Sequence, residues 1–456
     1  MNEKNLILLT DAYKMSHWQL YPENTEYVHS YAEARSGELI QFFGLQIYLM
    51  EYLKNPITKK DLNEAEEFVR AYSQPFFKQG WEKIIENHKG FMPLKIKSVA
   101  EGTNLPSSNV LLTVENTDPE FYWLPSYFET QILRAIWYPT SIASLSKKIK
   151  NLILGYLEKN GDENSINFKL HDFGARGVSS HESAMLGGAA HLINFDASDT
   201  VEGSIALQKY YNAPVVGRSL PASEHTNIIS FGDDEKSEEQ AFRKFLSIYA
   251  KPGTIVACVS DTRNIYLAID RLWGETLRQD IIDSGAIVVI RPDSGDPCIV
   301  APSCVHLLDQ KFGHSLNQKG YKVLNNVRVV QGDGITYEAI SSILEILDNM
   351  GYSADNITFG MGGALLQIPN RNTHSFAYKC SAVKINGKVI ETYKSPITDK
   401  GKISKKGILK LIKTEGVYTT VTDKEAGKDY LEEKFYNGKL LNMTDFAEVR
   451  KNSLED

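Results

Sequence analysis

The sequence has few cysteines and no long apolar run, and each shortage excludes a class of protein. Only four of its 456 residues are cysteines, and they form no CxxC pair and have no histidine partners at metal-ligand spacing. We therefore expect reduced thiols in a cytoplasmic protein. The apolar run near the N-terminus covers residues 6–9, too short for a signal peptide, and no run approaches the roughly 18 residues of a membrane span.

An excess of basic charge is also missing. The formal net charge is −7, which argues against nucleic acid or an anionic membrane as the main partner. The hydrophobic share of 42% and the charged share of 23% are ordinary for a globular protein with a large core. At roughly 150 residues a domain, the length suggests about two to four domains.

The region from 167 to 363 repeats one unit, in which a short apolar strand ends in a polar loop and a helical stretch usually follows. Six such units predict a (β/α) barrel whose loops converge at one mouth, with a doubly wound open sheet as the alternative. The six strand ends lie in residues 169–177, 192–200, 256–264, 288–296, 327–336 and 357–363.

The clearest of these units is the segment 285–297. Its β-branched run, 287–290, has no polar face and suits a strand buried on both sides of a parallel sheet. Arg291, Asp293 and Ser294 follow at once. Such groups are costly after a buried strand unless they are paired or used, so the segment indicates either a structural ion pair or a functional site.

The flanking segments indicate a second domain. Residues 1–160 are predicted to form an N-terminal α+β sheet domain that ends in a polar turn, and residues 161–375 form the barrel. Residues 376–456 contain two Asn-Gly turns, at 386–387 and 437–438, which are typical of β-hairpins. Two-residue links cannot join parallel strands, so we expect this C-terminal segment to pack on the N-terminal domain.

Carboxylates follow nearly every predicted strand of the barrel. Several acids at one rim repel each other unless they hold Mg²⁺, accept hydrogen bonds from ligand hydroxyls or pair with arginine. A phosphorylated sugar with Mg²⁺ would satisfy all three uses. The acids are Asp172, Asp199, Asp261, Asp293 and Asp333.

The same loops carry groups suited to anions. Glycine turns at 332–334 and 360–363 follow the last two strands, where a barrel commonly binds phosphate, although each could be a plain tight turn. Arg176, Arg291 and Arg371 could hold phosphate or pyrophosphate oxygens.

A histidine and an aromatic residue complete the predicted mouth. His225 lies in a polar loop, where it could act as a general acid, a nucleophile or a phosphate contact, although a lone histidine is more often structural. Phe173 follows Asp172 at a strand end and could stack on a planar ring or belong to the core.

Eight motifs, in this order, resemble those of the nicotinamide phosphoribosyltransferase family. The resemblance implies a type II phosphoribosyltransferase fold, an irregular α/β barrel beside a mixed sheet domain, working as a homodimer. It also implies the joining of nicotinamide to 5-phosphoribosyl 1-pyrophosphate, with Mg²⁺, to give nicotinamide mononucleotide and pyrophosphate. The motifs are TDAYKMSHWQLYP (10–22), HDFGARGVSS (171–180), DTVEG (199–203), LPASEHTNI (220–228), VSDTRNIY (259–266), IRPDSGDP (290–297), VQGDG (330–334) and FGMGGALLQ (359–367).

The resemblance assigns the base-binding residues. Phe173 resembles the ring that stacks on nicotinamide, with Tyr13 of the partner subunit on its other face. Asp199 resembles the acid that accepts the carboxamide NH₂ and would repel the carboxylate of nicotinate. Arg291 resembles a ligand of both the base and the diphosphate, and Arg176 a second diphosphate ligand.

The resemblance also assigns the catalytic and phosphate-binding residues. Asp261 and Asp293 would contact the ribose and the Mg-pyrophosphate. His225 resembles the histidine that binds diphosphate and is phosphorylated when ATP hydrolysis is coupled to synthesis, and it completes the catalytic set. The implied ligands of the ribose and its phosphate are Gly332, Asp333, Gly362, Gly363, Arg371 and Lys379, together with Arg35, Lys394 and Lys402, of which Arg35, Lys394 and Lys402 resemble partner-subunit residues.

Three positions depart from the family pattern. Ala257 stands where a serine commonly holds the carboxamide, which would weaken nicotinamide binding or relax discrimination against nicotinate. Ala175 replaces a tyrosine and Met361 a small residue. Nicotinate phosphoribosyltransferase is therefore the nearest alternative function.

Two further alternatives belong to other classes. A phosphosugar isomerase or aldolase on a barrel would need a Schiff-base lysine or a paired acid and base at a strand end, and no lysine occupies such an end. A binding protein without catalysis would bind phosphoribosyl pyrophosphate without turnover.

Overall fold

The computed structural model describes residues 4–398 and 402–455, and the chain divides into two compact units. The first boundary falls after Ser144, inside helix α5 (Glu129–Asn160), whereas the sequence suggested the polar turn that follows this helix. Unit 1 comprises Met1–Ser144, Leu207–Pro214 and Pro369–Asp456, and unit 2 comprises Leu145–Ala206 and Val215–Ile368.

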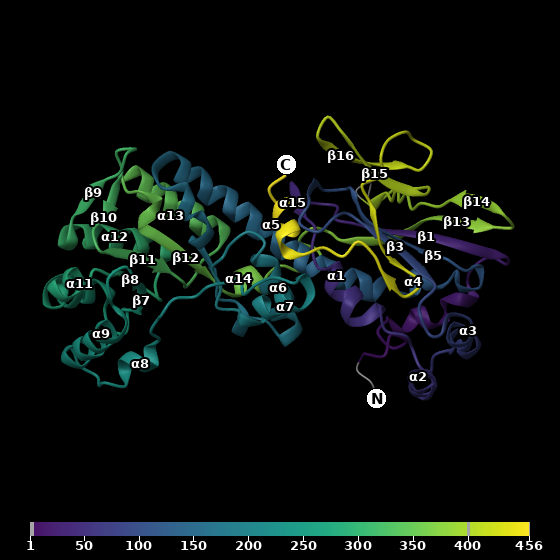
Figure 1. Cartoon of the computed structure of the whole chain (residues 1–456), viewed down its shortest axis with the longest axis horizontal. Coiled ribbons are helices and arrows are strands. Elements are labelled where there is room, and N and C mark those ends of the chain that lie inside the picture. Colours follow the sequence, from purple (N-terminus) through teal and green to yellow (C-terminus); the bar gives the residue numbers. More distant parts are fainter. Residues whose placement is uncertain (1–3, 399–401, 456) are drawn as a thin grey trace. The chain divides into compact units, whose positions relative to one another are not determined.

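A seven-stranded antiparallel sheet forms the centre of unit 1 (Figure 1). Its order, β14-β13-β1-β5-β3-β17-β18, places strands from both ends of the chain side by side. The Asn-Gly pairs at 386–387 and 437–438 have positive φ at both residues, as two-residue hairpin turns require. The strands are β1 (Thr25–Glu33), β3 (Leu94–Ser98), β5 (Val110–Asn116), β13 (Ala377–Ile385), β14 (Lys388–Glu391), β17 (Glu432–Tyr436) and β18 (Lys439–Leu440).

Helices of unit 1 supply the rest of its core. Helix α2 (Lys59–Ala71) begins with a capping box between Thr58 and Asp61, and α3 (Lys78–His88) buries Trp81 completely. The other elements are η1 (Ala12–Gln19), β2 (Leu39–Gln41), α1 (Leu45–Tyr48), η2 (Leu49–Leu53), β4 (Asn104–Pro106), η3 (Pro119–Phe121), α4 (Leu124–Tyr127), β15 (Leu409–Thr414), β16 (Val417–Thr422) and α15 (Phe446–Asn452).

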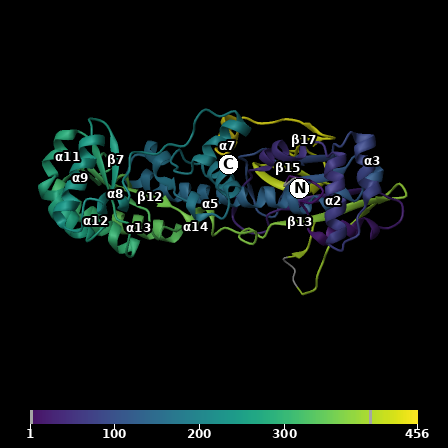
Figure 2. The ribbon, with the colours of Figure 1, turned by 90° about the horizontal axis from the view of Figure 1, so that it is seen from below.

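Unit 2 is built on a five-stranded parallel sheet of order β6-β12-β11-β8-β7. Figure 2 shows α9, α11, α12 and α13 gathered about β7 and β12. The strands are β6 (Leu170–Asp172), β7 (Ile255–Val259), β8 (Ile287–Arg291), β11 (Val327–Gln331) and β12 (Ile357–Met361). The other elements are η4 (Glu163–Phe168), η5 (Ala175–Gly177), α6 (His181–His191), α7 (Val201–Tyr211), α8 (His225–Ile229), α9 (Glu235–Tyr249), α10 (Ile265–Leu267), η6 (Ala268–Thr276), α11 (Arg278–Ser284), α12 (Pro297–Phe312), β9 (His314–Leu316), β10 (Lys322–Leu324), α13 (Tyr337–Asn349), η7 (Ala354–Asn356) and α14 (Gly363–Leu366).

Single residue bridges close this sheet into an irregular barrel. Parallel bridges join Asp172 to Ser198, Ala197 to Arg218 and Ala222 to Ala257, and so connect β6 back to β7. The predicted barrel is confirmed, but the predicted strand at 192–200 is wrong. Of the residues between the end of α6 at His191 and the start of α7 at Val201, only Ala197 and Ser198 form bridges, and no ladder forms.

Across the two described stretches of chain, 4–398 and 402–455, no helix combines the length and the apolar character needed to cross a bilayer.

Candidate active site

A pocket of about 470 Å³, here called the barrel pocket, runs through the interior of the barrel of unit 2. Alternate residues of one strand face it, namely Ile287, Val289 and Arg291 of β8, because successive side chains of a strand point to opposite faces. Arg291 ends the strand, so the pocket is apolar along its length and charged at its mouth. Its lining is Ser165, Phe168, Lys169, His171, Phe173, Asp199, Arg218, Ser219, Leu220, Ala222, Ile255, Ala257, Ile287, Val289, Arg291, Arg328, Val330, Asp355 and Thr358.

The mouth of the barrel pocket brings together Phe173, Asp199 and Arg291. The guanidinium carbon of Arg291 lies 5.6 Å from the centre of the Phe173 ring, within cation–π range. Gly360 makes room for this ring, since a Cβ added there would lie 2.0 Å from Phe173 Cε2. The mouth therefore offers an aromatic face, a carboxylate and a cation.

Ser219 is a mouth residue that sequence reasoning missed. Its hydroxyl donates a short hydrogen bond to Asp199 Oδ1, and it lines the pocket together with Ala257. The neighbouring His171 is buried, and burial lowers its pKa despite the attraction of Asp199, which favours a neutral ring. The position of Ser219, just before the LPASEHTNI motif, was the only sequence signal for it.

The opposite end of the barrel pocket carries two cations with structural partners, the buried Lys169 and the half-buried Arg328. Lys169 Nζ donates to the carbonyls of Ala354, at 3.0 Å, and Ile357, at 3.2 Å. Arg328 Nη1 donates to two backbone carbonyls at 2.6 and 2.7 Å. Burial lowers the pKa of Lys169 to about 8.

A second group at the strand ends, here called the His225 cluster, joins the three predicted catalytic residues. His225 Nε2 lies 3.5 Å from Asp261 Oδ1 and 3.7 Å from Asp293 Oδ2, while its Nδ1 lies 3.3 Å from Thr262 Oγ1. Arg291 Nη2 donates to Asp293 Oδ1 at 2.8 Å, which links the cluster to the mouth of the barrel pocket.

Asp172, in contrast, does not line the barrel pocket. It is fully buried and its Oδ1 accepts the amide of Gly174 at 2.7 Å, so it fixes the turn after Phe173. Burial raises the pKa of this carboxyl to about 6. Its predicted place among the mouth acids is wrong, because its side chain points into the protein.

The predicted glycine turns lie beside the mouth. A Cβ on Gly332 would lie 3.6 Å from both Arg291 Nε and Asp293 Oδ1, and a Cβ on Gly362 would lie 3.4 Å from the carbonyl oxygen of Phe173. A Cβ on Gly177 would lie 3.3 Å from Gly363 Cα. The turn η5, with its exposed Arg176, therefore adjoins the second glycine turn. Asp333 is exposed.

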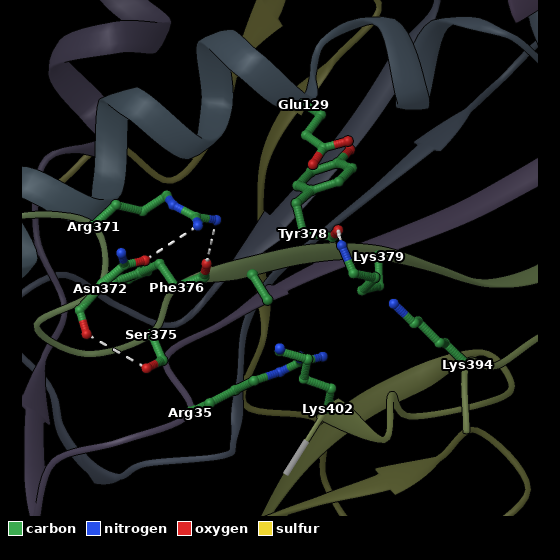
Figure 3. Close-up of a pocket in the computed structure, with 11 residues that line it drawn as sticks. Arg35, Glu129, Arg371, Asn372, Ser375, Phe376, Tyr378, Lys379, Lys394 and Lys402 are labelled. Carbon is green, nitrogen blue, oxygen red and sulfur yellow. Dashed lines mark hydrogen bonds between the residues drawn. The ribbon is translucent and has the colours of Figure 1, made fainter. Parts of the chain in front are cut away.

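Unit 1 contains a separate pocket of about 490 Å³, here called the cationic pocket (Figure 3). Five predicted phosphate-binding cations line it, and the figure shows them projecting from different segments into one space. Arg371 donates to the carbonyl of Phe376 and to Asn372 Oδ1, which fixes its guanidinium at the rim. The lining is Arg35, Glu129, Arg371, Asn372, Ser375, Phe376, Ala377, Tyr378, Lys379, Lys394 and Lys402.

The charges of the cationic pocket are nearly all positive. Among the described residues that line it, the one carboxylate is Glu129, which pairs with Lys14 at 2.6 Å and was not singled out from the sequence. Burial lowers the pKa of Lys379, and the nearby Arg35 and Lys394 add to the effect against the attraction of Glu129. A cluster of cations around one pocket is suited to an anionic ligand.

Tyr13 lies in η1 of unit 1, is 57% exposed and packs edge-on against His17. It does not line the barrel pocket of its own chain. Its ring is therefore available at the surface of unit 1.

Residues 168–439 match the model of the nicotinate phosphoribosyltransferase (NAPRTase) family, and residues 5–96 match that of the nicotinamide phosphoribosyltransferase N-terminal domain. The chain belongs to this phosphoribosyltransferase family. Membership makes it a pentosyltransferase of NAD biosynthesis.

Relatives along the whole chain are named nicotinamide phosphoribosyltransferase. The protein of that name from Xanthomonas campestris is 47% identical, over 98% of this phosphoribosyltransferase and 97% of the relative. The one from Mycoplasma genitalium is 34% identical, over 91% of this chain and 97% of that protein.

Solved structures of low identity share the fold. Nicotinate-nucleotide pyrophosphorylase from Pyrococcus furiosus has a TM-score of 0.62 at 16% identity, with 100% of this chain and 96% of that chain covered. Human nicotinic acid phosphoribosyltransferase has a TM-score of 0.58 at 14% identity, with 98% and 93% covered. These similarities confirm the predicted type II phosphoribosyltransferase fold of the chain.

Proposed function

We propose that this protein joins nicotinamide to 5-phosphoribosyl 1-pyrophosphate and releases nicotinamide mononucleotide and pyrophosphate. The observation that carries the proposal is the mouth of the barrel pocket, where Phe173, Asp199 and Arg291 surround one opening. An aromatic face suits the pyridine ring, and a carboxylate suits the NH₂ of its amide. The full-length relatives named nicotinamide phosphoribosyltransferase support the same base.

The chemistry needs little from the protein beyond positioning and charge. The bond from C1 of the ribose to pyrophosphate breaks through an oxocarbenium-like state, and the ring nitrogen of the base forms the new bond to C1. Phe173 and Asp199 would fix the base so that its nitrogen points at C1, while Arg291 and Arg176 would neutralise the departing diphosphate. The glycine turns at 332–334 and 360–363 would offer backbone amides to the ribose phosphate.

We further propose that His225 accepts a phosphoryl group from ATP. A lone pair of the imidazole would form the N–P bond and ADP would leave. The two carboxylates beside Nε2 would stabilise a protonated ring or orient a neutral one. Replacing His225 with alanine should abolish the stimulation of synthesis by ATP and leave synthesis without ATP measurable.

The donor set at the His225 cluster fits Mg²⁺. Asp261 Oδ1 is buried and accepts no hydrogen bond from the described residues, with His225 Nε2 at 3.5 Å, and Asp293 supplies further carboxylate oxygen, the ligand type that Mg²⁺ prefers. Within residues 4–398 and 402–455, no three His, Cys, Asp or Glu residues converge as a metal site, so the substrate's phosphate oxygens would complete the coordination. Bound Mg²⁺ would neutralise charge on the pyrophosphate.

The site is proposed to be shared between two copies of the chain. Tyr13 of the partner subunit would cover the free face of the nicotinamide ring, and the partner's Arg35, Lys394 and Lys402 would approach the phosphates. Exposure of Tyr13 and the placement of the cationic pocket in unit 1 support this arrangement.

We place the reaction in the cytoplasm because the four cysteines are all free thiols. Burial raises the pKa of Cys258 and of Cys304 to about 12, so neither is a reactive thiolate.

The decisive assay measures product formation by the purified protein with phosphoribosyl pyrophosphate and Mg²⁺. Nicotinamide or nicotinate would be the base, each with and without ATP. Mononucleotide from nicotinamide alone is the expected result. Turnover of nicotinate alone would overturn the proposal.

Nicotinate phosphoribosyltransferase is the second candidate, and one observation favours it. Ala257 lines the barrel pocket where the family commonly has a serine, so the carboxamide loses one hydrogen-bond partner. The carboxylate of Asp199 opposes this candidate, because it would face the carboxylate of nicotinate. The same assay separates the two.

A further inference from the structure

Glu33, the last residue of β1, lies outside the cationic pocket but contacts residues that build it. Its side chain is 2% exposed. Its Oε1 accepts from Arg35 Nε at 2.7 Å and from the Tyr31 hydroxyl at 3.3 Å, and its Oε2 forms a short ion pair with Lys405 Nζ. Every carboxylate oxygen of Glu33 is therefore engaged by a group near the pocket.

The hydrogen bond with Glu33 determines the orientation of the Arg35 guanidinium at the pocket. Because Nε is occupied, the planar guanidinium is fixed along that edge and its Nη atoms remain for a ligand. Arg35 Nη2 is buried and has no hydrogen-bond partner among the described residues.

The bond to Lys405 extends the effect of Glu33 to a second wall of the pocket. The amide of Lys405 donates to the Tyr31 hydroxyl at 2.8 Å. The preceding residue, Ser404, is bonded twice to Lys394, through its amide at 2.9 Å and its hydroxyl at 2.8 Å. Glu33 thus ties the segment that carries Lys394 and Lys402 to the strand that leads to Arg35.

We propose that Glu33 is a positioning residue for binding of the phosphoribosyl substrate: it acts through Arg35 and Lys405 and does not touch the ligand. The inference rests on the proposed function of the cationic pocket as a phosphate site. If Glu33 acted only through its charge, its removal would change the affinity for the substrate in the opposite direction. A carboxylate near an anion site repels the anion, so its removal would tighten binding, whereas loss of positioning weakens it.

The test compares Glu33→Gln with the unaltered protein. Isothermal titration measures binding of phosphoribosyl pyrophosphate without a base, and steady-state assays give KM and kcat at saturating nicotinamide. We expect the Kd and KM for phosphoribosyl pyrophosphate to rise on the order of tenfold, with kcat at saturation nearly unchanged, since the substituted residue acts on binding.

Glu115→Gln is the matched control. Glu115, on the adjacent strand β5, is also a carboxylate with lysine and tyrosine partners, with 13% of its side chain exposed, but it does not line the pocket. Its removal should lower the thermal unfolding midpoint and leave KM unchanged. An equal rise of KM in both variants would show a general effect of sheet stability and overturn the proposal.

A second variant keeps the charge constant. Tyr31→Phe removes the hydroxyl that bonds both Glu33 and the Lys405 amide, and it should raise KM in the same direction by a smaller factor. Unchanged or tighter binding in both Glu33→Gln and Tyr31→Phe would overturn the positioning role.

Inorganic phosphate is a probe that does not depend on the reaction. If the unaltered protein binds phosphate but not phosphoribosyl pyrophosphate, the proposed function fails, while weaker phosphate binding by Glu33→Gln still supports the positioning role. If it binds neither, both proposals fall.

Discussion

At the scale of single residues, base choice is expected to rest on Asp199. Its Oδ1 is occupied by the Ser219 hydroxyl, so the rest of the carboxylate faces the pocket. In Asp199→Asn the side chain no longer repels the carboxylate of nicotinate, and its new amide can donate a hydrogen bond to that carboxylate. We therefore expect kcat/KM for nicotinamide to fall about tenfold or more, while kcat/KM for nicotinate rises.

The ratio of kcat/KM for the two bases measures this effect. Asp355→Asn is the control, since this carboxylate lies at the opposite end of the same pocket and should not alter base preference. An unchanged ratio in Asp199→Asn would mean that the carboxylate does not meet the amide.

A second residue-scale prediction concerns Gly360. A methyl group there would lie 2.0 Å from Phe173 Cε2, so Gly360→Ala must displace the ring. We expect KM for nicotinamide to rise at least about tenfold, because the stacking face moves. Gly155→Ala is the control, since nothing lies within 4 Å of an added Cβ there. Normal nicotinamide kinetics in Gly360→Ala would refute stacking on Phe173.

At the scale of elements, Glu115 joins three neighbouring strands of unit 1. Burial alone would raise its pKa, but bonds from His29 on β1, from Lys95 on β3 and from Tyr27 outweigh burial and hold the pKa at about 2. A pKa depressed from 4.5 contributes stability above about pH 4.5, on the order of 3 kcal/mol, and this stability is lost as the pH falls toward 2.

Urea unfolding at a series of pH values measures this contribution. The unfolding free energy of the unaltered protein should exceed that of Glu115→Gln at pH 7, and the gap should narrow between about pH 5 and pH 2. A gap that stays constant with pH would show that the charge of Glu115 is not what stabilises the sheet.

Some strands of the barrel could be predicted from the sequence and one could not, for a physical reason. Strands such as β8 carry an unbroken apolar run that ends in charge, so both the strand and the location of Arg291 at its end could be predicted. The segment 192–200 has the same local appearance, but in the folded chain only Ala197 and Ser198 meet backbone partners for bridges. That constraint is tertiary, and no local pattern encodes it.

Among the site residues too, some could be predicted from the sequence and others could not. The resemblance supplied Phe173 and Asp199, which line the barrel pocket, and the residues of the His225 cluster, which Arg291 links to the pocket mouth. Ser219 and Glu129 do not follow a predicted strand, so their contacts with Asp199 and Lys14 become apparent only in the folded chain. Glu33 looked like an ordinary strand residue, since its partners lie two residues and several hundred residues away in sequence.

At the scale of the whole molecule, the proposed sharing of sites between two copies can be tested by mixing variants. Tyr13→Ala alters only unit 1 and Asp293→Asn only unit 2. Each alone should be nearly inactive. After the two are unfolded and refolded together, a mixed dimer would have one site with both native residues, so activity should return.

Each variant refolded alone is the control for this experiment. No recovery in the mixture, with mixed dimers demonstrated by a tag on one variant, would place both residues in a site within a single chain.

The barrel is closed on one side by single bridges, so we expect its backbone to open locally more easily on that side. Strands β8 and β11 are paired on both sides, whereas the arc around residues 197, 218 and 222 has only isolated bridges. Backbone amides of that arc should exchange with deuterium sooner than those of β8. The arc also carries Asp199 and Ser219, so the wall that we propose selects the base is the part of the barrel that can be remodelled with least disturbance to the rest.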